Sequence, residues 1–153
     1  MKFIFTIAML LTLNCFAQPQ ITWLKYFKTS TDPIRIHNII QMDDSGFVAT
    51  TSQYNPVPAN IIIRLDKYGD TLWTKIGKWG YGLLKSYDTC YYVLAGTSVV
   101  KLNANFDSIS SVDYSQYPFG SNIGGINLCY DSSIVLNSSS TVIKTDSLGV
   151  IQW

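Results

Sequence analysis

The only histidine of the chain, His37, lies in the strand-like run from Ile34 to Ile40. As a general base or ligand it would have to face a central cavity, whereas as an ordinary strand residue it would be half exposed. Strict strand alternation places it on one face with Arg35 and Ile39. The chain has no Gly-x-Ser-x-Gly turn that would supply a nucleophile beside it. We therefore predict no catalytic residue and a protein that is not an enzyme.

The acidic residues are expected to form turns rather than pairs of catalytic carboxylates. All ten are aspartates, and glutamate is absent. Asp43 and Asp44 are adjacent, so on a strand they would face opposite ways and could not act as a glycosidase pair. The segment from Asp66 to Asp70 does not have the spacing of a twelve-residue calcium loop. We predict no metal site and no cofactor.

Aromatic side chains that we expect to be exposed are the better functional candidates. Aromatic rings can stack on sugars or anchor a protein partner, because they offer contact area at a low entropy cost. Ordinary cross-strand packing is the alternative role for these side chains. The possible ligand contacts are Trp79, Tyr81, Tyr87 and Tyr91.

The N-terminal segment, residues 1–17, has the three parts of a secretory signal peptide. Lys2 precedes an apolar stretch at 3–13, and small residues stand at the −3 and −1 positions of a cut after Ala17. That stretch is shorter than the roughly 20 residues that span a bilayer. We expect export through the Sec pathway, a mature chain that begins at Gln18 and no later membrane span. A retained anchor or a lipoprotein at Cys15 is the alternative.

Two cysteines, Cys90 and Cys129, lie beyond this segment. An oxidising compartment would permit a disulfide between them, whereas two free thiols would pack as small apolar side chains. A disulfide and a pair of free thiols both remain possible interpretations at this point. Two isolated cysteines do not make a metal-binding signature.

Composition favours strands. The 153 residues include 17 Ile, 13 Thr and 10 Tyr but only 6 Ala, and β-branched and aromatic residues are typical of sheets. Charged residues make up only 14% and the formal net charge is +1. A disordered polyelectrolyte is thereby excluded, and the basic face that nucleic-acid binding requires is not indicated.

Three segments, 62–73, 99–110 and 142–153, share one pattern. Two apolar residues are followed by a basic residue, any residue and then Asp or Asn. Glycine stands three residues after the Asp, and Trp seven residues after it, except in the second segment. Asp or Asn can cap a turn, glycine supplies a positive φ, and Trp anchors the returning strand. The repeat residues are Asp66, Gly69, Trp73, Asn103, Asp146, Gly149 and Trp153.

Each hairpin has a turn and a strand upstream, at 43–52, 87–98 and 130–139. Candidate innermost strands precede these at Ile34–Met42, Tyr81–Tyr87 and Asn122–Tyr130. Four short strands in about 40 residues match a propeller blade. We predict an all-β chain of β-propeller-like repeats of four short antiparallel strands, about three blades, at 34–77, 80–115 and 122–153, with 20–28 as an extra closing strand. A β-sandwich is the alternative.

The segments 65–73 and 145–153 resemble the lysine–aspartate–glycine–tryptophan repeat of secreted Bacteroidota β-propeller proteins of the type IX secretion-associated kind. Asp43-Asp44-Ser45-Gly46-Phe47 is similar to their aspartate–glycine–glycine–tyrosine turn. The repeat is also loosely similar to the tryptophan-docking repeat of quinoprotein propellers. It departs from that repeat by one residue between Asp and Gly, and the chain lacks glutamate. For these reasons we do not expect a quinone cofactor. The resemblance implies an extracellular or cell-surface protein and hardly bears on its ligand.

Closed propellers have about four to eight blades. Because three repeats cannot close such a ring, and because Trp153 ends the sequence within an expected strand, we expect a partial propeller from a longer protein.

Two functions stay open. The first is an exported non-catalytic module that binds a glycan or protein or acts as a scaffold. The second is a fragment of a secreted carbohydrate-active enzyme whose catalytic residues lie outside this chain.

Overall fold

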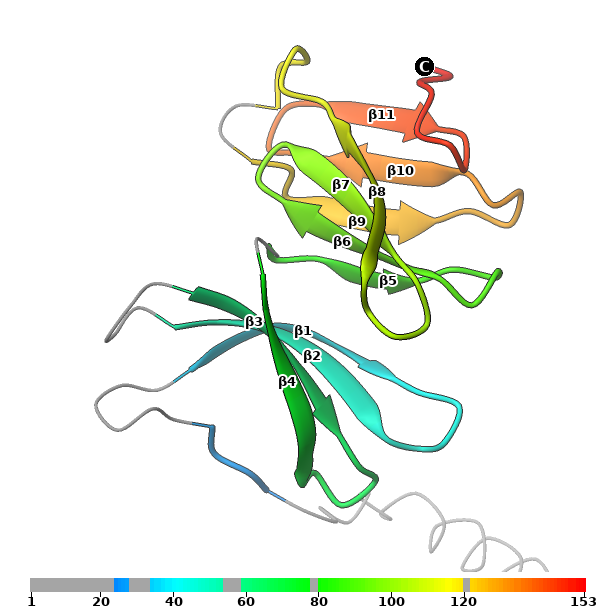
Figure 1. Cartoon of the computed structure of the whole chain (residues 1–153). Helices are drawn as coiled ribbons and strands as arrows, with labels where there is room; N and C mark the ends of the chain where they lie inside the picture. The colour runs from blue at the N-terminus through cyan, green and yellow to red at the C-terminus, as the bar shows by residue number, and fades with distance from the viewer. Residues whose placement is uncertain (1–23, 28–33, 54–58, 78–79, 120–121) are drawn as a thin grey trace, which may run out of the picture.

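The strand-rich sequence folds into three antiparallel sheets that follow one another along the chain (Figure 1). The computed structural model describes residues 24–27, 34–53, 59–77, 80–119 and 122–153. The first sheet contains β1 (Arg35–Gln41), β2 (Phe47–Gln53), β3 (Ala59–Leu65) and β4 (Thr71–Gly77). The second contains β5 (Leu83–Lys85), β6 (Tyr91–Ala95), β7 (Ser98–Leu102) and β8 (Ser108–Asp113). The third contains β9 (Gly125–Leu128), β10 (Ile134–Asn137) and β11 (Val142–Thr145).

The sheets meet along their first strands. β1 contacts β5, and β5 contacts β9, so the first strand of each repeat is the innermost one, as predicted. Within each sheet, every strand pairs with its neighbour in the chain. The three sheets are not closed into a barrel within the described residues. The fold-class prediction of an all-β chain with propeller-like repeats is confirmed. Where the third repeat should have a fourth strand, the structure has an isolated bridge between Thr145 and Ile151.

The predicted hairpin turn has one geometry in all three repeats. A side-chain oxygen of Asp66, Asn103 or Asp146 accepts hydrogen bonds from the backbone N–H groups two and four residues later, at 2.8–2.9 Å. The residue three positions on has a positive φ, which is 80° at Gly69 and 88° at Gly149. In the second repeat Phe106 adopts the same conformation, with a φ of 61°. The cap therefore imposes the turn even where glycine is missing.

A second repeated turn carries an ion pair that sequence reasoning missed. Asp44, Asp88 and Asp131 each accept a hydrogen bond from the backbone N–H two residues later. Each also binds the basic residue of the hairpin motif in its own repeat; the pairs are Asp44–Arg64, Asp88–Lys101 and Asp131–Lys144. The signal was the basic residue two positions before every capping Asp or Asn. The ion pair links the turn between the first two strands of each repeat to the third strand.

These ion pairs lower the pKa of the aspartates that form them. The hydrogen bond from Lys101 lowers the pKa of Asp88 to about 2. The hydrogen bond from Lys144 lowers the pKa of Asp131 below its usual value as well. Both carboxylates are therefore ionised at neutral pH, as an ion pair requires.

The core lies between successive sheets. β3 is buried on both faces, because Ile62 packs towards the second sheet while Ile61, Ile63 and Leu65 pack on the other side. The cluster between the first two sheets includes Val48, Ile62, Leu83, Tyr91, Val93, Leu102 and Phe106. The cluster at the third sheet includes Tyr92, Leu94, Val99, Tyr114, Phe119, Ile123, Ile134, Leu136 and Ile143. Each sheet thus covers the apolar face of the next.

Some predictions fall wholly or partly outside the described residues. The signal segment 1–17 does so entirely. Of the expected closing strand 20–28, only 24–27 are described; they form no strand, and Phe27 packs against Ile61, Ile63 and Leu65 instead. Cys90 and Cys129 are free thiols. Across the described ranges, no helix has the length and apolarity needed to cross a membrane.

Candidate functional site

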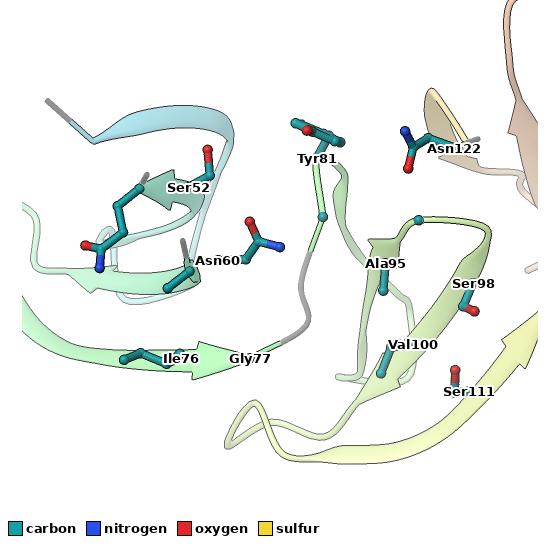
Figure 2. Close-up of a pocket in the computed structure, with 14 residues that line it drawn as sticks. Ser52, Asn60, Ile76, Gly77, Tyr81, Ala95, Ser98, Val100, Ser111 and Asn122 are labelled. Atoms are coloured by element: carbon teal, nitrogen blue, oxygen red, sulfur yellow. The ribbon is translucent and has the colours of Figure 1, made fainter. Parts of the chain in front are cut away.

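A cleft of about 840 Å³ lies between the first and second sheets. The ends of β2 and β4 and the start of β3 form one wall, and the β6–β7 hairpin with part of β8 forms the other. Figure 2 shows the amide of Asn60 directed into the space between the walls, with the Tyr81 ring above that space. The cleft is therefore built where two consecutive repeats diverge.

The lining of this cleft is uncharged and mixes polar with apolar residues. None of the 14 described residues that line it carries a charge. Its hydrogen-bonding side chains include Ser52, Asn60, Ser98, Ser111 and Asn122. Hydroxyl and amide groups both donate and accept hydrogen bonds. Such a lining suits a neutral ligand that is rich in hydroxyl groups.

Tyr81 is the aromatic residue of this cleft, and its side chain is 50% exposed. Two glycines hold the backbone on either side of it close to β6. A Cβ at Gly80 would lie 2.3 Å from the carbonyl oxygen of Leu94, and one at Gly82 would lie 2.7 Å from the Leu94 side chain. This tight approach fixes the segment and leaves the phenol ring at the cleft. The prediction of an accessible aromatic holds at this position.

His37 supports Tyr81 from the first sheet. The two rings meet edge to face, with centroids 4.4 Å apart. His37 Nε2 lies 2.8 Å from Ser52 Oγ, and Ser52 also lines the cleft. Burial, followed by the charge of Arg35, lowers the pKa of His37, so the imidazole is largely neutral at pH 7. The neutral His37 ring, hydrogen-bonded to Ser52, can fix the orientation of this serine in the wall of the cleft.

The alternation predicted for His37 is broken by a β-bulge. The pairing of β1 with β2 shifts between Ile36 and Asn38, so His37 is the extra residue of that strand. A bulge re-aims a side chain that strict alternation would have placed elsewhere. His37 is half-buried, as the ordinary strand-residue reading predicted.

The four predicted ligand contacts do not come together. Tyr87 is exposed, but it lies beyond the opposite end of β5 from Tyr81 and lines a separate hollow with Asp88. Tyr91 is 4% exposed and stacks on Phe106, with ring centroids 4.4 Å apart. The expectation that Tyr91 is exposed is wrong, because its ring fills the core between two sheets. Trp79 lies outside the described residues.

No group of three metal-ligating side chains forms among the residues that the structure describes. The polar cleft residues Asn60 and Asn122 were not singled out from the sequence. Their signal was weak, because Ser and Asn also occur at strand ends for local turn reasons.

The fold of the chain has a counterpart among solved structures. No family model and no curated protein matches the chain. The fold is similar to the crystal structure of a protein of unknown function from Bacteroides caccae, with a TM-score of 0.57 and 10% sequence identity. The match covers 78% of this chain and 45% of that protein. At this identity the likeness concerns the fold alone.

Proposed function

We propose that this chain is an exported, non-catalytic β-propeller-type module that binds a neutral glycan outside the cell or at its surface. The observation that carries the proposal is the uncharged cleft of about 840 Å³ with Tyr81 exposed in its wall. Sugar rings present axial hydrogens to aromatic faces and hydroxyl groups to amides and serines. The cleft supplies both kinds of partner within one space.

Two sequence features support the cellular setting of this proposal. Residues 1–17 have the pattern of a signal peptide, and the hairpin repeat resembles that of secreted Bacteroidota propellers of the type IX secretion-associated kind. The structural match to a Bacteroides protein fits the same source.

Replacing Tyr81 with alanine is expected to weaken glycan binding about tenfold, which corresponds to about 1.4 kcal/mol. The phenol ring would be lost from the cleft, while the backbone held by Gly80 and Gly82 would be kept. Affinity electrophoresis against neutral glucans, mannans and xylans, with polygalacturonate as the charged comparison, identifies the polysaccharide. Isothermal titration with its oligosaccharides then compares the variants.

Tyr87→Ala is the matched control, because Tyr87 is an exposed tyrosine outside the cleft. It is expected to bind like the unaltered chain. Equal losses in the two variants, or retention by polygalacturonate alone, would contradict the proposed site. New reducing ends on incubation with a polysaccharide would instead favour the carbohydrate-active enzyme alternative.

A further inference from the structure

The two boundaries between sheets are built from equivalent positions but are filled differently. In the first repeat Trp73 pairs across the strands with Arg64, and in the second Ser110 pairs in the same way with Lys101. Phe106 and Gly149 also correspond, because each lies three residues after its capping Asn103 or Asp146. Serine and glycine thus stand at the second boundary where tryptophan and phenylalanine stand at the first.

The first boundary is packed with aromatic rings. The indole of Trp73 lies against Phe106, with centroids 5.4 Å apart, and Phe106 stacks on Tyr91. These rings join Val48 and Ile62 in one apolar cluster. A more open hollow of about 470 Å³ remains at this boundary, beside Met42, Arg64 and the two rings of Trp73 and Phe106.

At the second boundary the equivalent space is a cavity of about 280 Å³. Its apolar walls include Val99, Val112, Ile134 and Leu136. A side chain cannot fill it from Gly149, because a Cβ there would lie 2.7 Å from Val112 Cγ2 and 2.9 Å from Tyr114 Oη. The small residue at Ser110 leaves the space open.

The phenol and ammonium groups around this cavity already have partners within the protein. Tyr114 Oη donates to the carbonyl of Gly149 at 2.9 Å, and Tyr92 Oη donates to the carbonyl of Ser147 at 3.3 Å. The ammonium group of Lys101 is paired with Asp88 at 2.8 Å. The aliphatic walls and the rings of the two tyrosines make up most of the surface that the cavity offers to a guest. A charged guest would find no unsatisfied counter-charge among these groups.

We propose that this cavity binds a small, uncharged aromatic molecule of about the size of an indole. The guest would take the position that the Trp73 side chain occupies at the neighbouring boundary. An apolar cavity of roughly 150 Å³ is large enough to hold benzene, so the larger space here suits a fused pair of rings. Exposed Leu148 and Ser110 lie at its edge and give access from solvent. This site is separate from the glycan cleft and does not depend on it.

Indole itself is the probe for the test. Titration into the full chain with labelled methyl groups is expected to give saturable shifts at Leu136 and Val112, with no comparable shift at Val48. At ten times its Kd, indole is expected to raise the Tm by about 4 °C. Indole-3-acetate, which adds a carboxylate to the same ring, is expected to bind at least about tenfold more weakly.

Ser110→Trp places an indole on the protein at the position equivalent to Trp73, and it is expected to weaken binding of free indole at least about tenfold. Ile109→Trp is the control, because it adds the same ring at the adjacent exposed position of β8; its affinity for indole is expected to be unchanged. Methyl shifts that do not saturate, that centre on Val48, or that persist in Ser110→Trp would overturn the proposal. If Ser110→Trp does not fold, Ser110→Leu and the methyl map of the unaltered chain decide.

Discussion

Phe106→Ala is expected to lower the free energy of unfolding by about 3–5 kcal/mol, and Phe106→Gly by roughly 1 kcal/mol less. The Phe106 ring is 2% exposed and contacts both Trp73 and Tyr91, so either substitution empties the first boundary between sheets. The backbone at this position has a φ of 61°, which strains alanine and phenylalanine but not glycine. Urea denaturation of both variants measures the difference.

Ile62 provides the matched control for the expectation that glycine is more stable than alanine at position 106. It is fully buried in the same cluster, but it lies within β3, where glycine carries the usual entropic disadvantage. Ile62→Gly is therefore expected to be less stable than Ile62→Ala, in the opposite order to the pair at Phe106. If Phe106→Gly proves less stable than Phe106→Ala, the cap does not impose the turn.

Arg64→Lys is expected to lower the free energy of unfolding by about 2 kcal/mol, although the charge is kept. The Arg64 side chain is buried, and its Nη1 donates to the carbonyls of Phe47 at 3.0 Å and Leu65 at 2.5 Å. Its Nη2 pairs with Asp44. A lysine ammonium cannot reproduce this fork, so at least one buried carbonyl loses its partner. Urea denaturation compares this variant with the unaltered chain.

The other repeats explain why arginine occurs only here in the motif. A Cβ at Gly46 would lie 2.5 Å from Arg64 Nη1, so only glycine leaves space for the guanidinium group. The second and third repeats have Cys90 and Ser133 at this turn position and use lysine. Lys101→Arg, the reverse exchange, is the control. Lys101 lies at a more open ion pair, so we expect a change within about 0.5 kcal/mol. A loss at Arg64 no larger than this would show that the fork is not important for stability.

The sequence was sufficient to predict the repeated hairpin because its determinants are local. Asp66, Asn103 and Asp146 bond to backbone groups only two and four residues away, and such caps are visible in the residue pattern. The strand order followed from the same spacing.

Features that depend on packing between repeats could not be predicted in this way. Tyr91 looks like any strand tyrosine, and only the position of Phe106 shows that its ring belongs to the core. The bulge at His37 follows from how β1 pairs with β2. The uncharged cleft joins residues that are far apart in the sequence, such as Ser52 and Asn122, so no local pattern marks it.

Cross-strand nuclear Overhauser effects provide the most direct measurement of the central claim, namely that one capped hairpin recurs and that its copies stack through their sheets. Matching contacts are expected across Arg64–Trp73 and Lys101–Ser110, together with a backbone approach of Lys144 to Trp153. Helical contacts in any of these segments, or a different strand register in each copy, would contradict it.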